Sequence, residues 1–242
     1  KLLYNHKYVN INFLGTESYQ GVYLSNIENT KKYTKLPLLK KNSSFDPSIS
    51  DYVILALPHA VSNKYVKNFY DKIKIIDMSA DFRFDDINTY ELNYGNEHSC
   101  SSLLGDFIYG LPEINRLNIC KARNIAVPGC YPTSILLPLI PLLKNNLIKT
   151  DNIIIDSKSG YSGAGKKFNI KNINDNDSLN LYNYNTNSHR HIPEIKQELS
   201  KFNLENDLAF SFNPHILPIF RGMMSTIYCD LNNGVKKNEI IE

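Results

Sequence analysis

A cysteine that follows a tight turn and opens an apolar stretch is the residue best placed for covalent chemistry. Asn124–Val127 is typical of a strand end, Pro128–Gly129 of a turn, and Cys130–Leu143 of an apolar helix. Pro132 fits the first turn of such a helix, where its missing N–H would be unpaired anyway. Free N–H groups and the dipole at a helix start can lower a thiol pKa from about 8.5 into the range of roughly 3.5–7.5. Cys130 is therefore a candidate nucleophile, and the alternative is a small buried apolar residue, as most free cysteines are.

Two imidazoles and a guanidinium stand together just before a short helical stretch, at His189, Arg190 and His191. A neutral imidazole is the usual general base near pH 7 and contributes roughly 10²–10⁴-fold in rate. The alternatives are a metal pair and a surface loop. A zinc site would need further ligands at fixed spacings, and the neighbouring sequence has none.

Two more stretches carry groups that suit anions. Ser157–Lys167 is a Gly/Ser-rich loop that leaves a strand and ends in two lysines, and its backbone N–H groups suit an anion or a cofactor amide. Its glycine spacing is not that of a phosphate-binding P-loop. Arg221 follows His215 in the next such stretch, where it could hold a substrate carboxylate through two hydrogen bonds.

A third glycine-containing stretch, Gly15–Gly21, looks at first like a dinucleotide-binding loop. Ser18 stands in place of the middle glycine, and Leu24–Asn29 does not have the pattern of a helix that would receive a pyrophosphate. We therefore interpret it as a loop after a strand, in contact with the adenosine ribose at most.

The elements that must position these groups begin with a strand–helix–strand rhythm. Tyr52–Leu57 is a near-continuous apolar run, which predicts a strand buried on both faces of a parallel sheet. Asn63–Tyr70 is predicted to be a helix and Lys74–Met78 the next strand, so that the crossover is right-handed. Ligands of such sheets bind beyond the carboxyl ends of the strands. We therefore expect three strand-exit loops to face one crevice: Pro58–His59, Ser79–Arg83 and Pro128–Cys130.

The flanking parts of the chain have other patterns. Tyr8–Leu14 alternates like a strand, and Ser25–Ser50 is polar and loop-like. After the Cys130 helix, strand-like stretches at 152–156, 208–212 and 224–229 are separated by long connections. This predicts an α/β domain over residues 1–131 and a mixed α+β domain over residues 132–242.

The composition narrows the class of protein. The chain has 242 residues, of which 42% are hydrophobic and 21% charged, as in ordinary globular proteins. A net charge of +3 is too small to argue for nucleic acid or membrane partners. Four cysteines without a C-x-x-C spacing indicate neither zinc nor a disulfide framework, which favours the reducing cytoplasm.

Taken together in chain order, the motifs closely resemble those of the N-acetyl-gamma-glutamyl-phosphate reductases, a family of arginine biosynthesis. The motifs that carry the resemblance are Ala56–Ser62, Asp77–Arg83, Tyr109–Glu113, Val127–Thr133, Ser159–Lys166, His189–Glu194, and Pro214–His215 with Arg221–Gly222. Aspartate-semialdehyde dehydrogenases are similar in fold and chemistry but differ around the cysteine and the histidines.

The resemblance implies a Rossmann-like NADP-binding domain with a parallel sheet, followed by an α+β domain for catalysis and dimerisation. It implies NADPH-dependent reduction of a small acyl phosphate, N-acetyl-glutamyl 5-phosphate, by a cytoplasmic homodimer or homotetramer. Cys130 matches the nucleophile and His191 the acid/base, with His189 as the alternative. The resemblance further implies no metal, substrate contacts from His189, Arg83, Arg221 and Glu194, and cofactor contacts from Ser159, Gly160, Gly163, Pro58 and His59.

The resemblance also has departures. The glycine-rich phosphate loop of the family is expected before Lys1 and its C-terminal segment after Glu242, so we expect a fragment that binds cofactor poorly and is inactive alone. Lys166–Lys167 stands where an Arg-Lys pair is common, and Tyr161 replaces a small apolar residue. The alternative functions are an aspartate-semialdehyde dehydrogenase-like reductase, a cofactor-independent thiol hydrolase or acyltransferase, and a non-catalytic fragment.

Overall fold

The first sheet of the molecule is parallel and lies in the N-terminal half of the chain. The structure, a computed structural model, describes residues 2–27, 30–164, 180–202 and 208–241. The strand order is β3-β4-β6-β5, and every neighbouring pair is parallel. The strands are β3 (Tyr52–Leu55), β4 (Lys74–Asp77), β5 (Phe107–Tyr109) and β6 (Asn124–Ala126), and the helices that connect them are α1 (Ser62–Phe69), α2 (Ile87–Tyr94) and α3 (Pro112–Lys121).

Local sequence signals explain where these helices start and stop. Asp86 precedes α2 and accepts the backbone N–H of Thr89 at 2.8 Å, as an N-cap does. Gly95 ends α2 with φ +65°, a left-handed conformation that suits glycine. Pro112 begins α3 at a position where proline costs no hydrogen bond. None of β5, α2 and α3 was predicted from the sequence.

The prediction for β3 was right about the strand and wrong about its burial. Tyr52 is 52% exposed and Ile54 40% exposed. β3 lies at one edge of the described sheet, and the face that carries these two side chains is uncovered. An apolar run alone does not distinguish a strand buried on both faces from one buried on a single face. Beneath the opposite face lies an apolar cluster formed by Leu55, Val66, Phe69, Ile73, Ile75, Phe82, Cys100, Leu104, Phe107 and Ala126.

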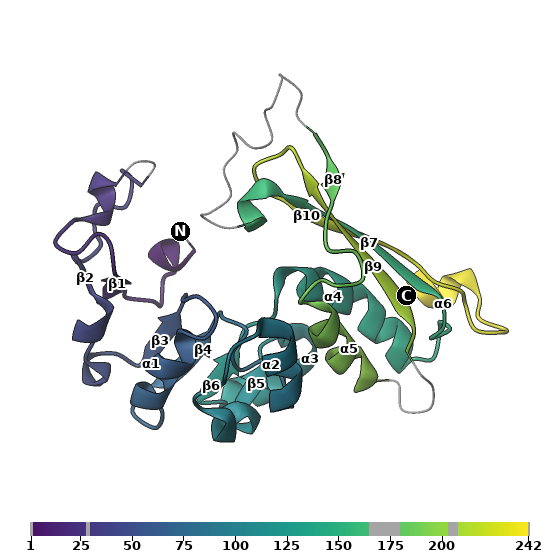
Figure 1. The fold of residues 1–242 in the computed structure, drawn as a ribbon, viewed down its shortest axis with the longest axis horizontal. Coiled ribbons are helices and arrows are strands. Elements are labelled where there is room, and N and C mark those ends of the chain that lie inside the picture. The colour runs from purple at the N-terminus through teal and green to yellow at the C-terminus, as the bar shows by residue number, and fades with distance from the viewer. Residues whose placement is uncertain (1, 28–29, 165–179, 203–207, 242) are drawn as a thin grey trace.

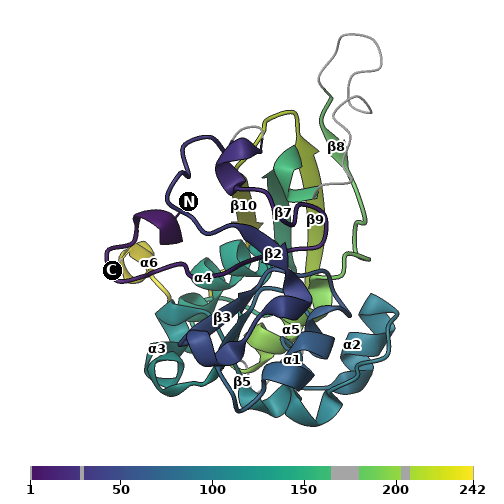
Figure 2. The ribbon, with the colours of Figure 1, turned by 90° about the vertical axis from the view of Figure 1, so that its left-hand side faces the viewer.

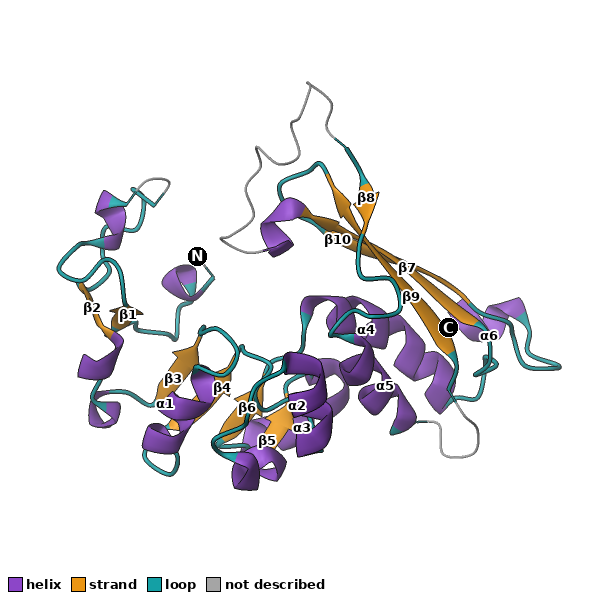
Figure 3. Cartoon of the chain, viewed as in Figure 1, coloured by secondary structure: helices purple, strands orange, loops and turns teal. Residues whose placement is uncertain are grey.

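The second sheet is mixed, and two helices lie between it and the first sheet (Figures 1 and 3). Its order is β10-β7-β9-β8, in which β7 and β9 are parallel and the outer pairs are antiparallel. The strands are β7 (Ile153–Gly160), β8 (Tyr182–Asn183), β9 (Phe210–Leu217) and β10 (Met223–Tyr228), and the helices between the sheets are α4 (Cys130–Lys144) and α5 (Ile192–Ser200). A short helix, α6 (Lys237–Ile241), follows β10. The predicted combination of a parallel α/β part and a mixed α+β part is confirmed.

One apolar core packs α4 and α5 against both sheets. In the view turned by 90°, the strands of the second sheet stand above α4 and α5 (Figure 2). Side chains of β7 alternate, so that Ile153 and Ile155 are buried while Ile154 is exposed. Tyr109 and Leu111 reach the same core from the end of β5. The core consists of these residues together with Tyr131, Ile135, Leu136, Leu139, Ile140, Leu143, Ile148, Ile195, Leu199 and Phe212. Residues of the first sheet are therefore packed directly against the helices that carry Cys130 and His191.

The N-terminal stretch differs from its prediction. The strand expected over Tyr8–Leu14 is instead the short β1 (Leu14–Thr16), which pairs in parallel with β2 (Leu39–Lys41), a strand that the polar pattern of Ser25–Ser50 did not indicate. Leu24–Asn26 forms one 3-10 turn and Ile27 is extended, so the described part of Leu24–Asn29 is not an α-helix, as the sequence indicated. The other 3-10 segments of the described chain are Leu3–Asn5, Asn42–Ser44, Pro47–Ile49, Ser101–Asp106 and Tyr161–Ala164. No described helix has the length and apolar character to span a membrane.

Candidate active site

Three loops meet at the carboxyl edge of the parallel sheet, as predicted. The backbone N–H of Ala80 donates to His59 Nδ1 at 3.1 Å, which joins the loop after β3 to the loop after β4. The guanidinium Nε of Arg83 donates to the carbonyl of Val127 at 2.8 Å, which joins the loop after β4 to the loop after β6. These hydrogen bonds hold the turn before Cys130 in a fixed place.

The turn that carries the cysteine requires a glycine. α4 begins at Cys130, as predicted, and Gly129 precedes it with an extended backbone. A Cβ atom on Gly129 would lie 2.8 Å from Nε2 of His191 and 3.0 Å from Oε2 of Glu194. The imidazole of His191 therefore packs directly against the residue before the candidate nucleophile.

The ionisation of Cys130 does not follow the sequence-based prediction of a lowered pKa. The residue is exposed, yet the surrounding protein still removes hydration from the sulfur, and this desolvation raises the pKa of the thiol. Backbone N–H groups of Tyr131 and Cys130 and the charge of Arg83 act in the opposite direction, with smaller effect. The helix start is present, but a base is needed to generate the thiolate near neutral pH.

His189 has both ring nitrogens occupied. Its Nδ1 accepts the backbone N–H of His191 at 3.1 Å, so the neutral ring carries its proton on Nε2. Nε2 lies 3.4 Å from the hydroxyl of Tyr184, which donates to the hydroxyl of Tyr131 at 3.2 Å. Burial, with the nearby charge of Arg190, lowers the pKa of His189 to about 4. His189 is thus a neutral ring held in one orientation.

His191, unlike His189, has a ring nitrogen without a hydrogen-bond partner. It is buried, and its Nδ1 has no hydrogen-bond partner. Burial lowers its pKa well below 6.5, and the rings and cations around it lower the pKa further. Nε2 faces Gly129, and the ring lies 6.0 Å from that of Tyr131, measured between centroids. A neutral imidazole beside the start of α4 can accept a proton near neutral pH.

Arg83 and Glu194, both predicted as substrate contacts, form a buried ion pair instead. NH1 of Arg83 lies 3.1 Å from Oε2 of Glu194, and their side chains are 6% and 0% exposed. Arg83 also donates to the carbonyls of Val127 and Met78. Glu194 is therefore closed to a substrate, and each guanidinium nitrogen of Arg83 already donates to the protein.

The exposed cation of the site is Arg190, which the sequence reasoning left without a role. Its guanidinium lies 6.0 Å from the centroid of the Tyr94 ring. Its charge lowers the pKa values of His59, His189 and His191, which places it near all three imidazoles. Its place between the two histidines of the motif is the sequence signal that could have identified it.

The predicted cofactor loop runs from the end of β7 toward the connection between β9 and β10. A Cβ atom on Gly160 would lie 2.9 Å from the backbone of Arg221, and one on Gly163 would lie 2.8 Å from the hydroxyl of Ser159. Internal packing therefore accounts for both glycines. Arg221 itself is exposed in this connection, against the Phe220 ring. Lys166 and Lys167 lie outside the described residues.

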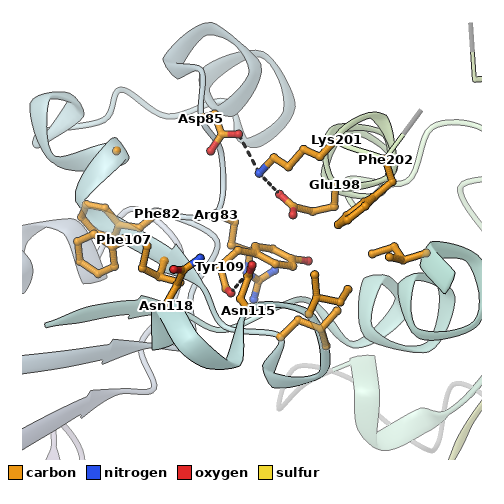
Figure 4. Close-up of a pocket in the computed structure, with 15 residues that line it drawn as sticks. Phe82, Arg83, Asp85, Phe107, Tyr109, Asn115, Asn118, Glu198, Lys201 and Phe202 are labelled. Carbon is orange, nitrogen blue, oxygen red and sulfur yellow. Dashed lines mark hydrogen bonds and ion pairs between the residues drawn. The ribbon is translucent and has the colours of Figure 1, made fainter. Parts of the chain in front are cut away.

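A cavity of about 260 Å³ lies beside this network (Figure 4). Arg83 and Tyr109 line one side, and Lys201 bridges Asp85 at 3.0 Å and Glu198 at 2.7 Å on another. Cys130 and His191 do not line it. Among the residues that the structure describes, no three His, Cys, Asp or Glu side chains gather as a metal site.

Comparisons with known proteins agree with these features. A family model described as "Semialdehyde dehydrogenase, NAD binding domain" matches residues 1–122, and one described as "Semialdehyde dehydrogenase, dimerisation domain" matches residues 130–242. The N-acetyl-gamma-glutamyl-phosphate reductase of Ehrlichia ruminantium (strain Gardel) is 43% identical over 244 residues, which cover 100% of this chain and 70% of that protein.

Two further relatives widen the comparison. A probable chloroplastic N-acetyl-gamma-glutamyl-phosphate reductase of Arabidopsis thaliana is 41% identical over 240 residues, or 99% of this chain and 60% of that protein. The chain thus spans 60% and 70% of the length of these two relatives. The crystal structure of aspartate semialdehyde dehydrogenase II from Vibrio cholerae, complexed with ASA, has a TM-score of 0.70 at 17% identity, over 99% of this chain and 71% of that one. At that identity the likeness concerns the fold.

Proposed function

The chain belongs to the semialdehyde dehydrogenase family, and within it to the N-acetyl-gamma-glutamyl-phosphate reductases, and on this premise we propose that it reduces N-acetyl-glutamyl 5-phosphate to N-acetyl-glutamate 5-semialdehyde and phosphate. The observation that supports this activity best is the start of α4. There an exposed thiol, two backbone N–H groups beside its sulfur, and an uncommitted neutral imidazole stand together.

NADP fits the carboxyl edge of the parallel sheet. Dinucleotides bind in the crevice beyond the strand ends of such sheets, and here the loops after β3, β4 and β6 meet at that place. Pro58, His59 and the Ser159–Gly163 loop remain our candidates for the cofactor contacts. When bound, NADPH supplies the hydride that reduces the acyl carbon.

The first half of the reaction transfers the acyl group to sulfur. His191 accepts the thiol proton as Sγ of Cys130 attacks the carbonyl carbon, so the free thiolate, which the raised thiol pKa and the lowered imidazole pKa both disfavour, need not form before the attack. The C–O bond to phosphate then breaks, the proton passes from His191 to the departing phosphate, and a thioester remains on Cys130. The reduction is thereby divided into two easier steps.

The second half forms the aldehyde on the same sulfur. Hydride addition to the thioester carbon places negative charge on the former carbonyl oxygen, and the N–H groups of Cys130 and Tyr131 are placed to stabilise such charge. The C–S bond then breaks and returns its electron pair to Sγ, so the aldehyde leaves. One proton taken from solvent restores the resting thiol.

The substrate carboxylate requires an exposed cation. Arg190 meets that need because it is exposed, whereas Arg83 is buried and each of its guanidinium nitrogens already donates to the protein. His189, fixed by Tyr184, is a neutral hydrogen-bond donor beside it. Arg221, in the connection between β9 and β10, remains a second candidate.

The dimerisation-domain match over residues 130–242 supports a homo-oligomer, which we propose to be a homodimer or homotetramer of the cytoplasm. We place the boundary between the two domains of the chain between residues 131 and 132. The proposed role for this second part is to combine catalysis with subunit contacts.

The activity is tested with the full-length protein in the reverse direction. N-acetyl-glutamate 5-semialdehyde, phosphate and NADP⁺ should together produce NADPH, measured by its absorbance, and Cys130→Ser should produce none. In the forward direction, phosphate release at full turnover without NADPH would instead establish a thiol hydrolase. Activity with aspartate 4-semialdehyde but not with the acetylated substrate would assign the protein to the other reductase.

A further inference from the structure

The carboxylate of Glu194 lies fully buried at the first turn of α5 and is bonded on both oxygens. Its Oε1 accepts the backbone N–H of Gly129 at 2.8 Å and the hydroxyl of Tyr109 at 2.8 Å. Its Oε2 accepts from NH1 of Arg83 at 3.1 Å. A carboxylate with three donors and no exposed surface is not available to a substrate.

The partners of Glu194 come from every element around the nucleophile. Tyr109 ends β5, Gly129 precedes α4, and Arg83 lies in the loop after β4. Arg83 extends the connection, since it also donates to the carbonyl of Val127 at 2.8 Å and that of Met78 at 3.1 Å. One side chain of α5 is thereby connected to the exits of β4, β5 and β6.

Glu194 also decides which amide at the start of α4 is free. The N–H of Gly129 donates to the carboxylate, whereas the N–H groups of Cys130 and Tyr131 remain directed at the sulfur. If the Gly129 N–H were released, the turn could rotate and carry the sulfur away from His191, whose Nε2 packs against Gly129. A displacement of about 1 Å at a reacting group can cost about 10²-fold in rate.

We propose that Glu194, with Arg83 and Tyr109 as its partners, is a positioning residue that fixes the Gly129–Cys130 turn and directs the thiol toward His191. The proposal deepens the proposed function and rests on Cys130 being its nucleophile. It replaces the substrate-contact role that the sequence suggested for Glu194 and Arg83.

The charge of the pair gives the proposal a distinct signature. Glu194 raises the pKa of the Cys130 thiol and Arg83 lowers it, because unlike charges act oppositely on the thiolate. Glu194→Gln keeps the size of the side chain and removes its charge, which leaves the Arg83 charge uncompensated. The pH profile of thiol alkylation should therefore move to lower pH, although turnover falls.

The experiment compares Glu194→Gln with Glu198→Gln in the full-length protein. Glu198 lies one turn further along α5, is also buried, and pairs with Lys201. For Glu194→Gln we expect kcat to fall about 10²-fold with KM nearly unchanged. The second-order rate constant of iodoacetamide with Cys130, measured against pH without substrate or cofactor, should show the shift. Glu198→Gln should match the parent protein in both measurements.

Two results would overturn the proposal. A raised KM with an unchanged kcat would show that Glu194 contacts substrate. An alkylation profile identical to that of the parent protein would show that Glu194 does not act on the thiol. If Glu194→Gln fails to fold, Tyr109→Phe removes a single donor to the same oxygen, and a kcat within twofold of the parent value would overturn the proposal equally. Failure of the parent protein to reduce the acyl phosphate would refute the proposed function alone, since the alkylation profile needs no substrate.

Discussion

Two helices start at the same edge of the parallel sheet, α1 after β3 and α4 after β6, and their starts are arranged in opposite ways. At α1, the carboxylate of Asp81 accepts the N–H of Ala60 at 2.9 Å and that of Asn63 at 3.1 Å. At α4, Gly129 provides no side-chain cap, and the N–H groups of the first helical residues face a sulfur. The free N–H groups of a helix start are thus used to bind a carboxylate that stabilises the turn at α1, and face the sulfur of a candidate nucleophile at α4.

Each start has a buried polar atom that lacks a hydrogen-bond partner. Near α1, the hydroxyls of Ser62 and Ser79 both donate to Asp77, and Tyr90 donates to Asp81 at 2.9 Å. Nδ2 of Asn63, in α1, and Nδ1 of His191, near α4, are both buried without a partner. Buried polar groups are normally paired, and of these two atoms the imidazole nitrogen is the one beside the candidate nucleophile, where it can serve in proton transfer.

Removing the sulfur should produce the largest effect. Cys130→Ser is expected to lower the proposed reduction by at least about 10³-fold, because no covalent intermediate can form. The measurement is NADPH formation in the reverse direction, on protein whose circular dichroism matches that of the parent. Cys120→Ser, at an exposed position of α3, should leave the rate unchanged.

A side chain added at Gly129, the residue before the sulfur, should have the next largest effect on the rate. In Gly129→Ala the new methyl group would lie 2.8 Å from Nε2 of His191, so the ring or the turn must move, and kcat should fall by about 10²-fold or more. Gly105→Ala is the matched control, since nothing lies within 4 Å of a Cβ atom there. Equal rates for both variants would mean that the fit of His191 against the turn has no consequence for the reaction.

Removal of the uncommitted imidazole should cost about 10²-fold in kcat, as is typical for a general base. His191→Asn is compared with His189→Asn, whose ring is engaged by Tyr184 and by the His191 amide. We expect the His191 variant to be the slower of the two. The reverse order would exchange the roles of the two histidines.

The sequence could predict the parts of this site that depend on neighbouring residues. The start of α4 at Cys130 and the meeting of three strand-exit loops follow from turn residues and strand order. The role of Glu194 could not be predicted, because its partners Arg83, Tyr109 and Gly129 are 111, 85 and 65 residues away in the chain. The thiol pKa was misjudged because the sequence shows a helix start and does not show how much hydration the fold removes.

The paired helix start should matter for stability and not for reactivity. Asp81→Ala removes the acceptor of two backbone N–H groups and of the Tyr90 hydroxyl, and it should lower the free energy of unfolding by about 2–3 kcal/mol. Urea unfolding measures that loss. The alkylation rate of Cys130 should stay at its parent value, and a change in it would show that the two helix starts are coupled.

The smallest effect should be a pH dependence of stability that belongs to the α4 side. The pKa of His189 is lowered to about 4 in the folded protein, from 6.5. The folded state then binds fewer protons than the unfolded state, so the contribution of His189 is complete above pH 6.5 and is lost as the pH falls toward 4. Unfolding in urea at pH 7.5 and 5 should show a smaller difference for His189→Gln than for the parent. An equal difference would mean that this imidazole is protonated in the folded protein.

The ion pair between Arg83 and Glu194 also sets an order of events during synthesis. A ribosome adds about 5–20 residues per second, so the 111 residues that separate the two partners delay the arrival of Glu194 by on the order of ten seconds. Through that interval the loop after β4, and later also the loop after β6, exist without the carboxylate that joins them. The thiol is translated roughly midway through this wait and stays outside its final turn until α5 has emerged.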